Sequence, residues 1–130
     1  MDTVSDLMVR DVLTVDPSDT IGEAAEKMNA ANVGAVVVVE DFARIVGIVT
    51  ERDLMRAVAA RARAAEARVR QWMTPNPVTI EPDLPIAEAA AIMFEHNFRH
   101  LPVVKDGRPL GIVSLRLLSR WAFESVQRAK

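Results

Sequence analysis

The pattern of apolar and polar positions in the first half of the chain predicts three strands and two helices. Residues 33–39 and 45–49 are runs rich in β-branched side chains, separated by a short polar turn, which predicts a hairpin. Residues 12–15 have the character of a short strand closed by turn residues. Apolar side chains recur at helical spacing over residues 21–31, and a second helix is expected to begin at Thr50. The order of elements is therefore βαββα.

The second half of the chain repeats this order. Strands are expected at residues 77–80, 100–104 and 109–113, and an Asp-Gly pair between the last two favours a tight turn. A helix is expected over residues 85–96, where a proline suits the first turn, and another from Ser114 onward. The two halves are therefore predicted to have the same local structure.

An internal duplication explains this similarity. When the chain is shifted by 65 residues, residues 8–41 align with residues 73–106, and 12 of these 34 pairs are identical where composition alone gives roughly 2. With two units only, the pattern indicates a duplicated half-domain. We predict an α+β fold of two pseudo-symmetric βαββα units, the first at 1–62, a connector at 63–68 and the second at 69–130.

Composition narrows the class of protein. Half of the 130 residues are apolar, which is enough for a packed core, and the longest apolar run is too short to span a bilayer. The chain has no cysteine, and its first residues lack the pattern of a secretory signal, so a cytoplasmic protein is expected.

Charge argues against nucleic-acid binding. The formal net charge is −2, and basic and acidic residues are interspersed. A weaker interpretation, RNA or DNA binding, would use a set of arginines and would show strong salt dependence. That set is Arg61, Arg63, Arg68, Arg70 and Arg99.

Catalytic and metal chemistry are not indicated. The sequence has no tyrosine, no cysteine and no glycine-rich phosphate loop, so we expect a protein that is not an enzyme and requires no cofactor. His96 and His100 have a spacing that could bind a metal on a continuous helix. The strand pattern that follows Asn97 is expected to place them on different elements, so no metal site is predicted.

Several short motifs occur in both halves or close a hairpin. They are Asp6-Leu7-Met8, Gln71-Trp72-Met73-Thr74-Pro75, Thr79-Ile80-Glu81-Pro82, Phe98-Arg99-His100-Leu101-Pro102, and the Gly-Ile-Val-Thr/Ser after residues 46 and 110. Together they resemble a tandem pair of cystathionine-β-synthase (CBS) domains, the arrangement called a Bateman module. The resemblance covers nearly the whole chain and implies units packed through their sheets, clefts that can hold adenosyl ligands, and homodimers.

The sharpest candidate site begins at Thr50. Thr50-Glu51-Arg52-Asp53 lies where a strand is expected to end and a helix to begin, a junction whose free N–H groups favour anions. The resemblance implies that Thr50 and Asp53 contact a nucleotide. A carboxylate can accept hydrogen bonds from both hydroxyls of a ribose, and the threonine hydroxyl can face phosphate. The same spacing also fits a capping box, so the pair could merely satisfy the helix start.

Further residues are predicted around this pair. Arg52, Arg99, His100 and Arg116 are candidate partners for a phosphate, or else solvated or dimer-facing side chains. An apolar slot for adenine could come from Thr14, Val15, Ala35 and Val36, although core packing is the better interpretation for each valine. In the second unit Ser114 keeps the hydroxyl, but Leu117 replaces the acidic residue and cannot accept a ribose hydrogen bond. One good site per chain is therefore expected.

Two functions remain open from the sequence. The first is a regulatory module that binds AMP, ADP, ATP or S-adenosylmethionine in the cleft between the units, acts as a homodimer and is read by a protein partner. The alternative is a dimerisation or docking scaffold that binds no ligand. Aromatic residues near the unit edges, Trp72, Trp121 and Phe123, are expected to cover a core or a dimer face, with the helix at 115–128 a weak dimer candidate.

Overall fold

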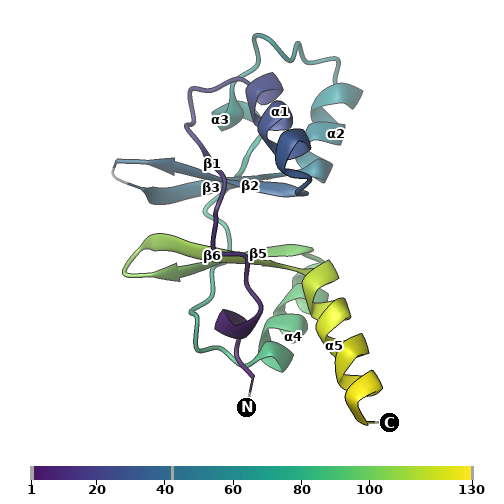
Figure 1. Cartoon of the computed structure of the whole chain (residues 1–130). Coiled ribbons are helices and arrows are strands. Elements are labelled where there is room, and N and C mark those ends of the chain that lie inside the picture. Colours follow the sequence, from purple (N-terminus) through teal and green to yellow (C-terminus); the bar gives the residue numbers. More distant parts are fainter. Residues whose placement is uncertain (1, 42, 130) are drawn as a thin grey trace. The chain divides into compact units, whose positions relative to one another are not determined.

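The computed structural model describes residues 2–41 and 43–129. Contacts divide the chain into two compact units, one formed by Val12–Pro77 and one by Met1–Asp11 with Val78–Lys130. We call them the first-repeat unit and the second-repeat unit. Each combines helices with β-structure, which confirms the predicted α+β class (Figure 1).

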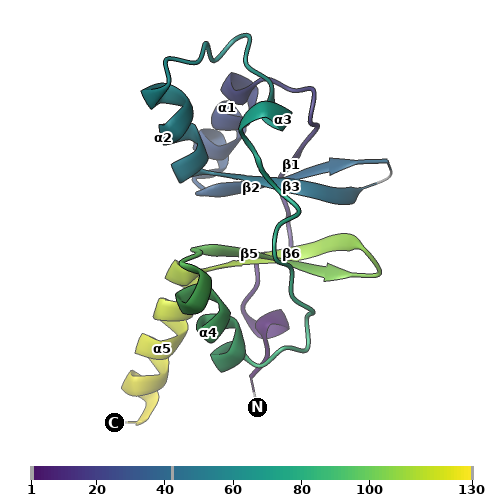
Figure 2. The ribbon, with the colours of Figure 1, turned by 180° about the vertical axis from the view of Figure 1, so that it is seen from behind.

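The first-repeat unit is a four-stranded sheet with three helices on one face (Figures 1 and 2). The strand order is β1-β2-β3-β4; β1 is parallel to β2, and the other neighbours are antiparallel. The elements in chain order are β1 (Thr14–Val15), α1 (Ile21–Ala31), β2 (Ala35–Glu40), β3 (Arg44–Thr50), α2 (Glu51–Ala59), α3 (Val69–Trp72) and β4 (Thr74–Pro75).

The second-repeat unit has the same plan around a β-hairpin. Helices α4 and α5 lie on one face of the hairpin (Figure 2). Asp106 and Gly107 both have positive φ, as the predicted tight turn requires. The elements are the 3₁₀ turn η1 (Val4–Asp6), α4 (Ile86–His96), β5 (His100–Lys105), β6 (Arg108–Ser114) and α5 (Leu115–Ala129).

Equivalent local signals position the equivalent helices. Helices α1 and α4 cover the same positions of the two repeats, and each ends at a left-handed asparagine, Asn32 or Asn97. Asparagine adopts this conformation more readily than most residues, so it stops a helix. Their starts differ: Thr20 and Glu23 form a full capping box before α1, whereas Pro85 precedes α4 and makes no side-chain cap bond.

Each repeat begins with a leading segment, residues 2–11 in the first repeat and 69–76 in the second. Each leading segment packs in the unit of the other repeat. Met73 lies against Gly47 of the first repeat, where an added Cβ would come within 2.5 Å of its sulfur. Met8 lies in the same way against Gly111 of the second repeat. Strand β4 extends the sheet of the first-repeat unit beside β3. Within the second-repeat unit, Val9 makes the equivalent bridge to Ile112. The packed units therefore differ from the sequence repeats at 1–62 and 69–130, and the connector at 63–68 packs within the first-repeat unit.

One predicted strand is shorter than expected. Residues 77–80 contain a single ladder position, where Ile80 makes a parallel bridge to Val103, equivalent to the pairing of Val15 with Val38 in the first-repeat unit. Asn76 has a positive φ of 46°, which interrupts an extended chain after Pro75. The predicted strand therefore has the expected partner but only one bridge, and Asn76 separates it from β4, which pairs with β3.

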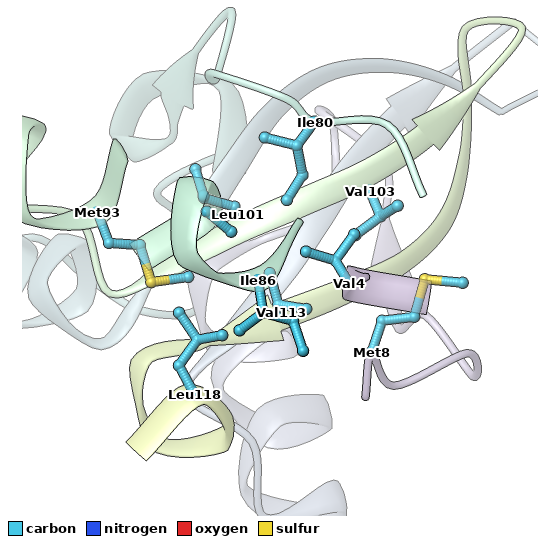
Figure 3. Packing of buried hydrophobic residues seen from close by; sticks show 10 residues of the cluster. Val4, Met8, Ile80, Ile86, Met93, Leu101, Val103, Val113 and Leu118 are labelled. Carbon is cyan, nitrogen blue, oxygen red and sulfur yellow. The ribbon is translucent and has the colours of Figure 1, made fainter. Parts of the chain in front are cut away.

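Each unit has its own apolar core. In the second-repeat unit Val4 and Met8 of the leading segment pack with side chains from β5, β6, α4 and α5 (Figure 3). The labelled members are Val4, Met8, Ile80, Ile86, Met93, Leu101, Val103, Val113 and Leu118. The core of the first-repeat unit includes Val15, Ala24, Met28, Val36, Val38, Val49 and Val69. The leading segments are therefore part of the cores.

Among residues 2–41 and 43–129, no helix has the length and apolar character needed to cross a membrane.

Candidate functional site

The junction between β3 and α2 is the site that the sequence predicts. Thr50 ends the strand in an extended conformation and lies opposite Ala35 on β2. The Thr50 hydroxyl accepts a hydrogen bond from the Asp53 N–H at 3.3 Å, and the Thr50 N–H donates to Asp53 Oδ2 at 2.9 Å. The Glu51 N–H donates to the Gly34 carbonyl at 3.1 Å. The capping box is therefore present, and two donors of the first helical turn are already used.

Asp53 is the one buried charged residue among those described, with 2% of its surface exposed. Burial of a carboxylate is costly unless its oxygens are bonded, and here they are. Oδ2 also accepts from the Thr50 hydroxyl at 3.1 Å, and Oδ1 accepts from the Arg56 guanidinium at 2.5 Å. The Thr74 hydroxyl lies 3.2 Å from Oδ1 and 3.4 Å from Oδ2. The carboxylate is thus surrounded by hydroxyl donors and one cation.

Sequence reasoning missed Arg56 and Thr74 as members of this site. Arg56 follows Asp53 by three residues, a spacing that brings side chains together on a helix. Thr74 reaches the carboxylate because β4 pairs with β3 and sets Thr74 opposite Ile48. The duplication offers no signal for Thr74, because Thr74 belongs to the second sequence repeat and Asp53 to the first, and only the packed unit brings them together.

The equivalent junction between β6 and α5 keeps the backbone and loses the acceptor. The Leu117 N–H donates to the Ser114 hydroxyl at 3.1 Å, which is the same cap bond as in the first repeat. Leu117 and Val9 occupy the positions of Asp53 and Thr74, and Arg120, equivalent to Arg56, lies 3.8 Å from Glu124 instead. This junction caps a helix but offers no carboxylate.

The other predicted residues of the first-repeat unit have different surroundings. Val15 and Val36 belong to the apolar core, so their side chains pack inside the unit. Ala35 is buried beside Thr50 in the sheet register. Thr14 is half-buried in β1, and its carbonyl accepts from Lys27 Nζ at 3.0 Å. Arg52 is exposed on the first turn of α2. Ala35 and Arg52 are therefore the predicted residues nearest in chain or sheet to the Thr50 and Asp53 pair.

Three predicted residues, Arg99, His100 and Ser114, lie in the second-repeat unit. His100 begins β5 and lies opposite Ser114 at the end of β6. Arg99 is exposed, and its carbonyl accepts from the Leu115 N–H at 2.8 Å. The structure brings these three together at the second junction; their contribution to a site at Asp53 stays a prediction.

The two histidines lie on different elements, as predicted, because α4 ends at His96 and β5 begins at His100. Within the described part of the chain, no group of three His, Cys, Asp or Glu side chains could hold a metal ion. Trp121 packs against the core of the second-repeat unit and donates from Nε1 to Asp2 Oδ2 at 2.9 Å, whereas Phe123 is exposed.

Comparison with known proteins identifies the family. The model of the CBS domain matches twice, at residues 4–60 and 69–124. The chain belongs to the CBS domain family. The CBS domain-containing protein YhcV of Bacillus subtilis is 36% identical over 115 residues, which are 88% of this chain and 81% of that protein. The CBS-domain containing protein ATU1752 of Agrobacterium tumefaciens has a crystal structure with a TM-score of 0.84 and 38% identity, covering 91% of both chains.

Two similar solved structures contain adenosyl compounds. The CBS domain pair of protein MJ0100, in complex with 5-methylthioadenosine and S-adenosyl-L-methionine, has a TM-score of 0.87 and 29% identity, covering 93% of this chain and 99% of that one. CBSX2 in complex with AMP has a TM-score of 0.80 and 28% identity, covering 95% and 98%. This chain is thus a CBS pair whose structural neighbours include nucleotide-bound proteins.

Proposed function

We propose that this CBS pair is a regulatory, non-catalytic module that binds an adenosyl ligand at Thr50 and Asp53. The ligand class is AMP, ADP, ATP or S-adenosylmethionine. The observation that carries the proposal is the buried Asp53 carboxylate, which already accepts hydrogen bonds from two side-chain hydroxyls. Adenosyl compounds in similar CBS pairs give the class of ligand.

The chemistry of this carboxylate suits a ribose. Its two oxygens can accept from two neighbouring hydroxyls, and a ribose presents such a pair. Exchange of one donor for another preserves the number of hydrogen bonds, so the net change is small compared with the loss of an acceptor. Exposed Arg52 on the first turn of α2 is a candidate partner for a phosphate. The contribution of Arg99, His100 and Ser114, a homodimer and a cytoplasmic location stay predictions.

Calorimetric titration with AMP tests the assignment. Asp53→Ala is expected to weaken binding by about 1.5–3 kcal/mol, because a charged acceptor is lost. Leu117→Ala, the equivalent position of the other repeat, is the matched control and should retain AMP affinity. Circular dichroism on both variants checks that the fold survives loss of the cap. Unchanged AMP affinity in the Asp53 variant would refute the site.

A second candidate function rests on the same residue. Because Asp53 is fully engaged with its own backbone and neighbours, it could serve only as a cap in a dimerisation or docking scaffold. A thermal shift screen separates the two functions. Ligand at 100 times its dissociation constant stabilises a fold by about 2.7 kcal/mol, which is several degrees for a domain of this size. A scaffold without a ligand would show no shift with any adenosyl compound.

A further inference from the structure

The Asp53 carboxylate has no vacant acceptor position. Its two oxygens offer about four lone-pair directions. Four groups donate to them: the Thr50 N–H, the Thr50 hydroxyl, the Arg56 guanidinium and the Thr74 hydroxyl. A ribose whose hydroxyls bind Asp53 must therefore displace at least one of these donors.

These donors differ in how easily they can leave. The Thr50 N–H is part of the backbone at the helix start, and the Thr50 hydroxyl is held by the Asp53 N–H. Thr74 has a short side chain on β4, whose backbone is paired with β3. Arg56 is different, since its side chain is long and 54% exposed, and water can solvate the guanidinium after it leaves. Arg56 is thus the donor whose displacement from Asp53 costs the least free energy.

We propose that Arg56 is a displaceable counter-ion that occupies Oδ1 of Asp53 in the free protein and is exchanged for a ribose hydroxyl when a ligand binds. The inference rests on the proposed function and adds a residue that sets affinity at the same site. Arg56 competes with the ligand for Oδ1, so the intrinsic affinity of Asp53 for a cis-diol exceeds the affinity that is observed. Arg56 competes only with the ribose hydroxyls of the ligand and not with its adenine or phosphate groups.

The second repeat supplies a matched control. Arg120 stands at the position of Arg56 on the equivalent helix, but the residue three positions before it is Leu117, and Arg120 lies by Glu124. Removal of Arg120 therefore deletes an exposed cation from an equivalent helix turn, and the carboxylate that it releases, Glu124, is exposed and not buried like Asp53. An effect of overall charge would be the same for both arginines, and competition at Asp53 would be specific to Arg56.

Titration calorimetry with adenosine and with 2′,3′-dideoxyadenosine tests the proposal. Adenosine is chosen because it carries the diol without a phosphate that Arg56 could contact. Arg56→Met is expected to bind adenosine about three- to tenfold more tightly, as expected for the loss of a partly exposed ion pair that competes with the ligand. Affinity for the dideoxy compound should not change. Arg56→Lys should restore part of the competition, and Arg120→Met should match the unaltered chain.

The outcomes separate this inference from the function on which it rests. If the unaltered chain binds adenosine and Arg56→Met binds it equally or more weakly, the competition is refuted while the ribose site stands. An equal gain for adenosine and its dideoxy analogue would also refute it, because the effect would then not involve the diol. If no variant binds adenosine, the competition for a diol is refuted, and the AMP titration of the unaltered chain and Asp53→Ala decides whether the ribose site stands. Arg56→Gln repeats the test with a polar side chain should the methionine variant fold poorly.

Discussion

The junctions at Thr50 and at Ser114 begin equivalent helices with the same hydroxyl cap, but only the first contains a buried carboxylate. Around Asp53 the structure adds a second hydroxyl from Thr74 and a cation from Arg56. Around Leu117 the equivalent of that hydroxyl is missing too, because Val9 stands in its place. A helix start therefore does not need the carboxylate, and of the side-chain donors around Asp53 only the Thr74 hydroxyl is lost with it, since Ser114 and Arg120 remain.

This difference teaches how to separate capping from binding. A cap needs one side-chain acceptor for an N–H group, and Ser114 provides it alone. The first junction has a capping box and, in addition, a hydroxyl donor from a strand more than twenty residues away. Helix capping alone does not require that distant contact, which joins β4 to the start of α2.

The largest effect is expected when the first junction is converted into the second. Asp53→Leu should lower the free energy of unfolding by about 2–3 kcal/mol, because the Thr50 N–H and the Thr74 hydroxyl, both part-buried, lose their acceptor. Adding Thr74→Val should recover part of this loss, since the pair then matches Leu117 and Val9. Urea unfolding measures both variants. A double variant as unstable as the single one would show that Thr74 is not satisfied through Asp53.

A smaller effect is expected from the reverse conversion. In a double-mutant cycle on Leu117→Asp and Val9→Thr, we expect a favourable coupling of about 0.5–1.5 kcal/mol in the free energy of unfolding. The reason is that Val9 bridges to Ile112 as Thr74 pairs with Ile48, so a new hydroxyl would face the new carboxylate. Urea denaturation of the four proteins gives the coupling, and a value of zero would mean that the two junctions differ in backbone as well as in side chains.

The smallest expected effect is that of pH at the starts of helices α1 and α4. Hydrogen bonds from the Thr20 N–H, and then from its hydroxyl, hold the pKa of Glu23 below its ordinary value of 4.5. A lowered pKa in the folded state contributes stability above the ordinary value, and this contribution is lost as pH falls through the folded-state value. In acid unfolding followed by circular dichroism, the stability of Glu23→Gln should thus decrease less with falling pH than that of the unaltered chain. Glu88→Gln, at a helix start with no side-chain cap, is the control for loss of charge, and an identical change there would contradict the assignment.

Much of the fold could be predicted because the signals are local and occur twice. Helix α1 has the predicted bounds, and the hairpins lie within a residue or two of their predicted positions. The exchange of leading segments could not be predicted, because periodicity reports which face of an element is apolar and not which partner covers it. The apolar pattern that includes Val4 and Met8 is the same whether these residues pack on the first or the second repeat.

The candidate site was predicted in part for the same reason. Thr50 and Asp53 are close in sequence, and their capping geometry follows from their spacing. Arg56 was within reach of the same reasoning, as an ion pair three residues apart on a helix. Thr74 was not, since its approach to Asp53 depends on the pairing of β4 with β3 and on the turn at Asn76. A contact across distant segments needs the tertiary structure.

The exchanged segments also affect how the chain is made. During synthesis from the N-terminus, Val4 and Met8 leave the ribosome before the hairpin and helices that they pack against exist. Those first residues must stay without their native partners until residues 78–129 follow, whereas the first-repeat unit can close as soon as residue 77 is free. A ribosome that pauses once residue 77 has emerged would therefore hold one folded unit and an apolar leading segment without its packing partners.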